Sequence, residues 1–488
     1  MRVPTVQADA HYIQPFAFAG RRPVTDRTVT LRVPRWRTAA MAALYATSLS
    51  VAAVSPALAQ GLPLIRDTEI ENVLKDYSKP IFKAAGLSAN NISIRIVREQ
   101  SFNAFVLDGR HVYINTGTLM QAKTPNEVIG VLAHETGHIV GGHLAALRSR
   151  ISHDATKSLL LTVLGIGMIV AGAASGGDAR DIGTAGTGVM MGGNEMIMRS
   201  ILSERRAQES SADQAGMRFL EATKQSGRGM LETFERFAQQ EYISATYQDP
   251  FVRSHPVAAN RLAQLRDRVN NSRYASVTDP PQLQLRHDMI GAKLSGYLEP
   301  LQTVMNRYPA SDNSLPARYA RAIARNCSGK CTQAIGEVDA LLREQPNNPY
   351  FWELKGNLYY WNGKYEQAIP ALRKSLALVG NDESLIQAEL AQTLLATESP
   401  AFLNEAVALL RRSILLDDNY STAHHQLAQA FYKQGKFPQA DLAAAQAHFV
   451  EGNVKQAKIF AKRALAKLPR GSPEWIRAED IINYKEET

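Results

Sequence analysis

The chain has 488 residues, of which 45% are hydrophobic and 21% charged, so it is long enough for more than one globular domain. Its formal net charge of +9 falls to +4 without residues 1–59, which hold 7 Arg and 2 Asp. This mild charge, together with the lack of a basic motif interleaved with aromatic residues, excludes nucleic acid as an expected partner.

Residues 1–59 have the features of a leader that is removed. Basic residues within 32–37 precede a stretch, 38–54, that is almost apolar apart from Ser and Thr, and residues 57–59 read Ala-Leu-Ala, which fits a signal-peptide cleavage site. The alternative is an N-terminal membrane anchor, but the apolar stretch is Ala-rich and short for a span. Residues 1–31 show no folding pattern. We therefore expect a signal peptide and a periplasmic protein.

Residues 103–117 alternate like a hairpin or an edge strand that leads into a helix. Thr124 suits the N-cap of that helix, Pro125 suits its first position, and Glu127 would complete a capping box. The sequence therefore predicts a helix that starts at residue 125.

This helix carries His134, Glu135 and His138 in the pattern H-E-x-x-H. Histidines at i and i+4 project from one face, so both can bind one zinc ion while Glu135 reaches a water bound to it. The alternative, two surface histidines, is disfavoured because the helix also has an apolar face of the kind that is buried. That face consists of Val128, Val131 and Leu132.

A catalytic zinc site needs a third protein ligand. In the long metzincin motif it would be a histidine six residues after His138, but that position is Leu144, although Gly141 fits the pattern. His143 is one residue out of register. We interpret it as a structural residue, or one that supports a metal ligand.

Glu209 and Asp213 share a helix face and offer the missing group. Glu209 can bind zinc while Asp213 accepts the outer N–H of a ligand imidazole, which fixes its tautomer. Glu204 is the competing candidate. A charged, solvated helix face is the alternative for the whole segment.

Residues 158–175 form an uncharged run of 18 residues, and Gly-rich sequence continues to residue 193. We prefer a mobile hydrophobic hairpin or lid over the active site. A membrane-surface contact and a plain core helix are the alternatives.

The residues His134-Glu135-x-x-His138 and Glu209-x-x-Ala212-Asp213 resemble the gluzincin family that includes the HtpX and CAAX-prenyl peptidases, and especially its soluble periplasmic branch, the BepA-type peptidases. The resemblance implies one Zn²⁺ per chain, held by the two histidines and Glu209. Zinc chemistry then makes Glu135 the general base, and later the proton donor to the leaving amine.

The resemblance implies further site residues. The strand at 103–117 would lie beside the cleft, so that Asn103, Ala104 and Phe105 bind substrate backbone by strand addition. Ser254-His255-Pro256 and Arg261 are similar to a segment of the same branch, in which the histidine occupies the open zinc position and keeps the enzyme latent. Arg261 would support the site or act on the transition state.

The last third of the chain predicts tetratricopeptide repeats. Ala322, Gly356, Ala391 and Ala428 recur at intervals of 34, 35 and 37 residues, and small residues there let the paired helices approach. Ser399-Pro400 indicates a lengthened turn, and we expect the array to close at about residue 468. Such a surface suits extended segments of partner proteins.

Cys327 and Cys331 are placed for a local disulfide in an oxidising compartment, with two partly buried helical thiols as the alternative. The pair His424-His425 is interpreted as helix surface rather than as a metal site. Neither feature predicts a second metal centre.

Together these features predict an α+β, mostly helical chain: a zincin metallopeptidase domain at 61–275, then an α-solenoid of tetratricopeptide repeats at 282–488. We expect a zinc endopeptidase of periplasmic quality control. The resemblance implies misfolded or stalled outer-membrane proteins as substrates and the β-barrel assembly machinery as the partner of the repeats. The alternative is a chaperone or assembly factor with a largely latent zinc site.

Overall fold

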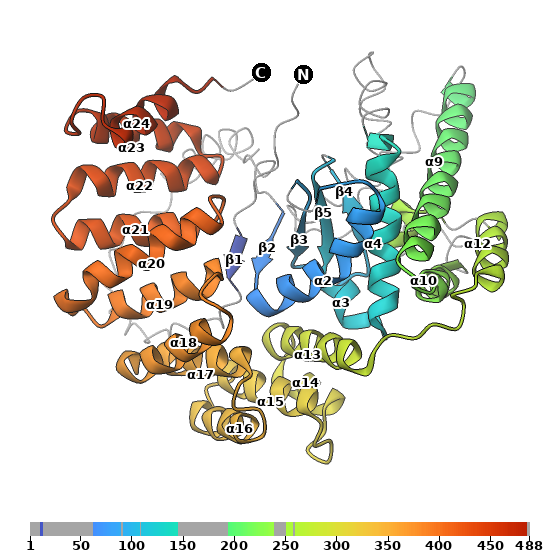
Figure 1. Cartoon of the computed structure of the whole chain (residues 1–488), viewed down its shortest axis with the longest axis horizontal. Helices are drawn as coiled ribbons and strands as arrows, with labels where there is room; N and C mark the ends of the chain where they lie inside the picture. Colours follow the sequence, from blue (N-terminus) through green and yellow to red (C-terminus); the bar gives the residue numbers. More distant parts are fainter. Residues whose placement is uncertain are drawn as a thin grey trace, which may run out of the picture.

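A computed structural model of the chain describes residues 10–12, 62–88, 91–107, 109–144, 194–238, 250–256 and 259–485. It consists of a small mixed sheet with helices around it, followed by a long array of paired helices (Figure 1), which confirms the predicted fold class. Within these ranges no helix is both long enough and apolar enough to cross a membrane. The cleavage site expected at 57–59 and the lid expected at 158–193 lie outside the described residues.

The sheet has the strand order β1-β2-β3-β5-β4. Its strands are β1 (Ala10–Tyr12), β2 (Leu64–Arg66), β3 (Ser93–Val97), β4 (Ala104–Val106) and β5 (His111–Asn115). The last two form the antiparallel hairpin predicted for 103–117, with Ala104 opposite Ile114. This pairing leaves β4 at one edge of the sheet.

At the other edge β1 pairs parallel with β2, within a segment in which we found no folding pattern. The expectation of no structure there is wrong at these three residues. A strand this short joins a sheet edge through backbone hydrogen bonds, which need no pattern of side chains.

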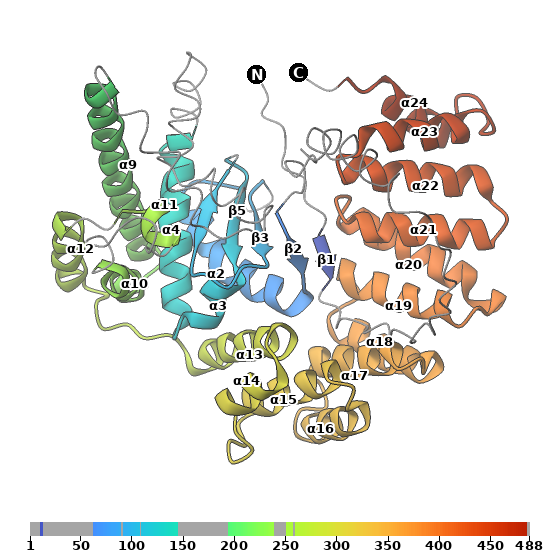
Figure 2. The ribbon, with the colours of Figure 1, turned by 180° about the vertical axis from the view of Figure 1, so that it is seen from behind.

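Seven helices of the described residues precede the repeat array. They are α2 (Thr68–Ala84), α3 (Thr116–Gln121), α4 (Pro125–Val140), α9 (Asn194–Ala222), α10 (Arg228–Ala238), α11 (Pro250–Ser254) and α12 (Ala259–Asn271). As Figure 2 shows from behind, α4 lies between the sheet and α9. The apolar face predicted for α4, Val128, Val131 and Leu132, is buried in the main core.

The start of α4 agrees with the prediction except in one contact. Thr124 Oγ1 accepts a hydrogen bond from the Glu127 N–H at 3.3 Å. Glu127 Oε1, however, accepts from the N–H of Lys123 rather than that of Thr124, and its Oε2 is paired with Arg236 Nη2 at 2.5 Å. The capping contact is therefore shifted by one residue, because the buried Glu127 carboxylate also forms an ion pair with Arg236 of α10.

The repeat array begins with α13 (Pro281–Leu298), which also contacts α2 and α3 of the first domain. The following helices are α14 (Leu301–Arg307), α15 (Leu315–Cys327), α16 (Cys331–Glu344), α17 (Pro349–Trp361), α18 (Tyr365–Leu378), α19 (Ser384–Ala396), α20 (Leu403–Leu416), α21 (Ser421–Lys433), α22 (Phe437–Val450), α23 (Val454–Leu465) and α24 (Pro473–Asn483). A Cβ at Gly356 would lie 2.5 Å from Leu372 Cγ, so the small residue is required where α17 meets α18.

Three expectations for this region have a clear outcome. The lengthened turn holds a 3-10 helix, Pro400–Phe402. The array does not close near residue 468, because α24 follows and buries Ala478 and Ile481 against α23. Cys331 is a free, half-buried thiol, so the disulfide expected for it is not formed.

The array curves around the β1–β2 edge of the sheet (Figure 1). Polar contacts join the two parts, including Arg66 Nη2 to Asp417 Oδ2 at 2.7 Å and Asn72 Nδ2 to Glu383 Oε1 at 2.9 Å. A cleft of about 1340 Å³ lies between them, with residues of α2, β3 and β5 on one wall and residues of the repeats on the other. None of the H-E-x-x-H residues lines this cleft.

Candidate metal centre

The two histidines of α4 converge as their spacing predicts. Their rings are 4.8 Å apart, and His134 Nε2 lies 3.1 Å from His138 Nε2. Both therefore direct the same nitrogen toward one point.

Helix α9 brings a carboxylate to that point because it packs closely on α4. A Cβ at Gly137 of α4 would lie 2.7 Å from the Ala212 carbonyl oxygen of α9. Glu209 is buried, with Oε2 3.4 Å from His134 Nε2 and Oε1 3.5 Å from His138 Nε2.

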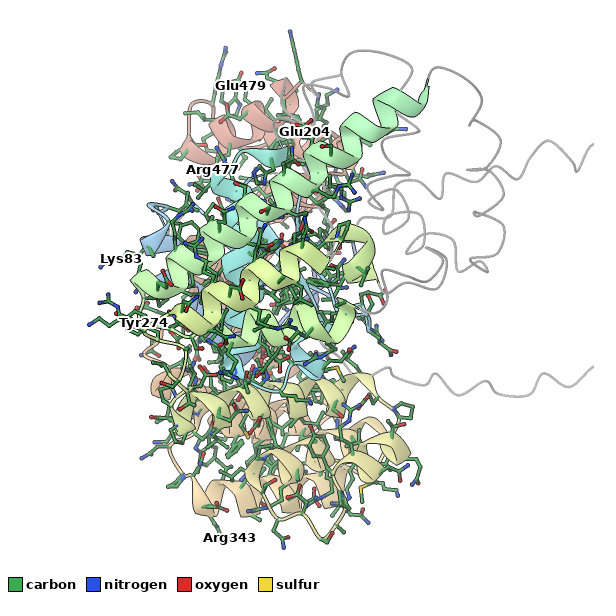
Figure 3. All side chains as sticks on the ribbon, turned by 90° about the vertical axis from the view of Figure 1, so that its right-hand side faces the viewer. Lys83, Glu204, Tyr274, Arg343, Arg477 and Glu479 are labelled. Carbon is green, nitrogen blue, oxygen red and sulfur yellow. The ribbon has the colours of Figure 1, made fainter. Side chains whose placement is uncertain are left out.

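Glu204, labelled on α9 in Figure 3, accepts a hydrogen bond from Gln208 at 3.2 Å and is not among the clustered donors. The structure thus places Glu209, and not Glu204, with the two histidines.

Asp213 lies one turn further along α9, and its Oδ1 is 3.0 Å from His134 Nδ1, on the outer side of that ring. Arg261 of α12 donates to both oxygens of Asp213 at 2.8 Å and to the Pro256 carbonyl, and its Nη1 is 3.3 Å from Glu209 Oε2. This bidentate pair holds the carboxylate against the imidazole.

His255 follows α11 and inserts into the same cluster. Its Nδ1 is 3.2 Å from both His134 Nε2 and Glu209 Oε2, and its Nε2 is 3.2 Å from both Glu135 Oε1 and the Ala104 carbonyl oxygen. One ring therefore touches the candidate metal ligands, the candidate base and the edge strand.

Glu135 is buried, and this burial raises the pKa of its carboxyl group. His143 lies on the outer side of the second histidine, with its Nδ1 2.9 Å from His138 Nδ1.

The three residues expected to bind substrate lie around β4. Asn103 Oδ1 accepts a hydrogen bond from Ser254 Oγ at 3.0 Å, Ala104 is in contact with His255, and Phe105 is stacked on Tyr113 with ring centroids 5.4 Å apart. The edge strand and the histidine cluster thus share one site.

Sequence reasoning missed three residues that shape this site. Arg205 donates to the Ser254 carbonyl oxygen at 2.5 Å, while Phe234 and Phe251 pack on the rings of His134 and His255. Arg205 and Phe251 each lie four residues before a site residue, and this spacing was the available signal.

The donors fit a zinc ion in number, type and charge. His134, His138, Glu209 and His255 each offer one ligand atom, and these atoms all lie within 4.8 Å of one another. Burial lowers the pKa of His134, but the Asp213 and Glu209 carboxylates outweigh it and raise that pKa to about 10. Burial likewise raises the pKa of Glu209, yet His255, His138 and Arg261 hold it well below its usual range. Imidazole and carboxylate ligands suit zinc, and the carboxylates of Glu209 and Asp213 supply negative charge next to the site.

An H-E-x-x-H helix joined to a glutamate on a later helix defines this protein as a metallopeptidase. Residues 65–269, which span this domain, match the model of peptidase family M48.

The known proteins similar to this chain include relatives over most of its length. It is 25% identical to the beta-barrel assembly-enhancing protease of Yersinia pestis over 440 residues, which are 86% of this chain and 84% of the relative. The corresponding protein of Escherichia coli K12 is 23% identical over 425 residues, with the same coverage. The metalloprotease LoiP of Escherichia coli K12 is 27% identical over 201 residues, which are 40% of this chain and 71% of LoiP.

Proposed function

We propose that the chain is a zinc endopeptidase of periplasmic quality control that acts on misfolded or stalled outer-membrane proteins. The observation that carries the proposal is the convergence of His134, His138 and Glu209 beside the buried Glu135. The relatives named beta-barrel assembly-enhancing protease support this class of substrate and place. The repeats would recruit the substrate or the assembly machinery.

A zinc ion held by His134, His138 and Glu209 would supply a water of lowered pKa and would polarise the peptide carbonyl. Glu135 accepts the proton of the attacking water and delivers one to the leaving amine. Residues 103–105 at the edge of the sheet hold the substrate backbone as an added strand. We assign Arg261 a positioning role, because its guanidinium group is engaged by Asp213 and Pro256.

The contacts of His255 favour a second function: a chaperone or assembly factor whose peptidase site is mostly latent. The ring occupies the space between the ligand set, Glu135 and the Ala104 carbonyl oxygen, which are the groups that catalysis needs. A latched peptidase could bind client proteins through its repeats without cutting them.

The Glu135→Gln variant tests the proposal, because it keeps the metal ligands and removes the base. We expect unchanged zinc content by elemental analysis, with cleavage of an unfolded β-barrel protein reduced at least ~100-fold. Retained cleavage would contradict the peptidase mechanism. If the variant restored outer-membrane assembly in cells that lack the protein, the chaperone function would be favoured.

A further inference from the structure

A second group of metal-type ligands lies in the repeat array. His425 is on α21, His448 is in the last turn of α22, and Glu451 is the C-cap residue of α22. The two helices lie side by side (Figure 1), so the start of α21 meets the end of α22. None of these residues belongs to the peptidase centre.

The three side chains are already close to a coordinating arrangement. His425 Nε2 lies 2.5 Å from Glu451 Oε1, His448 Nδ1 lies 3.2 Å from Glu451 Oε2, and one donor atom from each residue falls within 4.8 Å of the others. Two ligands that are each about 2.1 Å from a tetrahedral ion lie roughly 3.4 Å apart. Only small side-chain movements separate the observed cluster from a bound one.

The scaffold holds two of the ligands in place. Phe460 of α23 is stacked on His448, with ring centroids 5.4 Å apart and planes at 27°. The backbone N–H of Glu451 donates to the Ala447 carbonyl oxygen at 3.0 Å, and that of Asn453 donates to the His448 carbonyl oxygen at 2.8 Å. The side chain of His425 is 43% exposed, so an ion has access from solvent.

The two imidazole rings, with centroids 5.4 Å apart, flank a single carboxylate. A divalent cation would use both imidazoles in their neutral form and the carboxylate together. We propose that His425, His448 and Glu451 form a second binding site for Zn²⁺ or a similar transition-metal dication.

Donor type sets the selectivity of the site. Two imidazole nitrogens favour Zn²⁺, Co²⁺ or Ni²⁺, whereas Ca²⁺ and Mg²⁺ need oxygen ligands. Glu451 also lines the cleft between the sheet and the repeats. A bound ion would therefore lie beside that cleft and would link α21 to α22.

The test uses the full-length protein, stripped with a chelator, dialysed against a slight excess of Zn²⁺ and analysed for zinc by mass spectrometry. We expect His425→Asn/His448→Asn to bind one zinc ion fewer per chain than the wild type. The difference between the two proteins does not depend on how much zinc the peptidase centre holds. His111→Asn, which removes a histidine from the opposite wall of the cleft, should leave the zinc content unchanged.

A second variant keeps the test decisive if the double variant fails to fold. Glu451→Gln retains a hydrogen-bonding side chain and removes only the charged ligand, and the same loss of one zinc ion is expected. Equal zinc contents in the wild type and in a folded Glu451→Gln protein would overturn the proposal. Saturation of the site by Ca²⁺ would overturn the assignment to a transition metal.

Discussion

At the scale of single residues, the His255 ring contacts the metal ligands, the base and the edge strand of the candidate centre. Its Nδ1 faces His134 and Glu209, while its Nε2 faces Glu135 and the edge strand. A substrate strand that uses the Ala104 carbonyl oxygen must compete with this ring. The same side chain thus opposes both catalysis and substrate binding.

We therefore predict that His255→Ala increases peptidase activity about tenfold, because it frees the base and the strand edge while three metal ligands remain. The measurement is the initial rate of cleavage of an unfolded β-barrel protein. The double variant Glu135→Gln/His255→Ala is the control and should be inactive, since the gain depends on the same base. An unchanged or lower rate for the single variant would contradict the latch.

Asp213 acts through His134 rather than on substrate, because it lies on the outer side of that ring and is fixed by Arg261. Asp213→Asn should weaken zinc binding about 10- to 100-fold, because the amide no longer provides the charge that orients the imidazole. Competition with a chromophoric chelator measures this affinity. Glu204→Gln, on the same helix, is the matched control, and an equal effect of both substitutions would refute the assignment.

The residues of the site differ in how far the sequence predicts them. His134, Glu135 and His138 lie on one helix, so their geometry follows from local spacing alone. The choice of Glu209 over Glu204 rested on the helix face that it shares with Asp213 and on a resemblance, and the packing of α9 on α4 places only Glu209 with the histidines. Phe234 was missed because nothing local links it to His134, the histidine that it contacts.

At the scale of elements, the contact between α4 and α9 sets the distance from the histidines to Glu209. It depends on two glycines: a Cβ at Gly137 would lie 2.7 Å from the Ala212 oxygen, and one at Gly216 would lie 3.2 Å from the Ala133 carbonyl carbon. The two helix backbones approach closely at both positions. Any side chain there separates the metal ligands.

Gly137→Ala should therefore lower stability by about 1–3 kcal/mol and also reduce zinc affinity, because a rigid backbone neighbour must move. Gly336→Ala is the control, since this glycine is exposed on α16 and its Cβ would meet nothing within 4 Å. That substitution should be neutral, or stabilising by up to ~1 kcal/mol. Thermal unfolding and zinc titration of the two proteins decide the point, and equal behaviour would contradict the close-contact argument.

Elements with a local signal were predictable, and those defined by tertiary contacts were not. The start of α4 follows from Thr124 and Pro125, and the repeats follow from small residues at regular intervals. Strand β1 lacks such a signal and is held by the edge of β2. Helix α24 does begin with the capping residues Ser472 and Pro473, but its place in the array depends on its burial against α23. The shifted capping contact of Glu127 has the same origin, because Arg236 arrives from another helix.

At the scale of the whole molecule, the repeats are joined to the peptidase domain through a buried charge. Lys293 of α13 has its Nζ 2.8 Å from Asp67 Oδ2, 3.3 Å from Glu69 Oε2 and 3.5 Å from Glu353 Oε2. Tyr319 of α15 donates a further hydrogen bond to Glu69 at 3.0 Å. The sequence could not predict this junction, because its members are up to 286 residues apart.

Lys293→Met should destabilise the protein by about 3–5 kcal/mol, because it leaves three buried carboxylates without their cation.

Burial raises the pKa values of Glu69 and Glu353, and Lys293 opposes that rise, so both values increase further in the variant. When the pKa of a carboxyl group is higher in the folded than in the unfolded state, the folded state binds more protons. The free energy of unfolding of the protein then falls as the pH rises from the unfolded-state pKa through the folded-state pKa. The deficit should therefore be larger at pH 8 than at pH 5. Thermal unfolding at both pH values tests this, with Lys355→Met as the control: its partly exposed pair with Asp339 contributes at most ~1 kcal/mol. A deficit as small as that of the control at both pH values would show that this junction does not hold the two parts together.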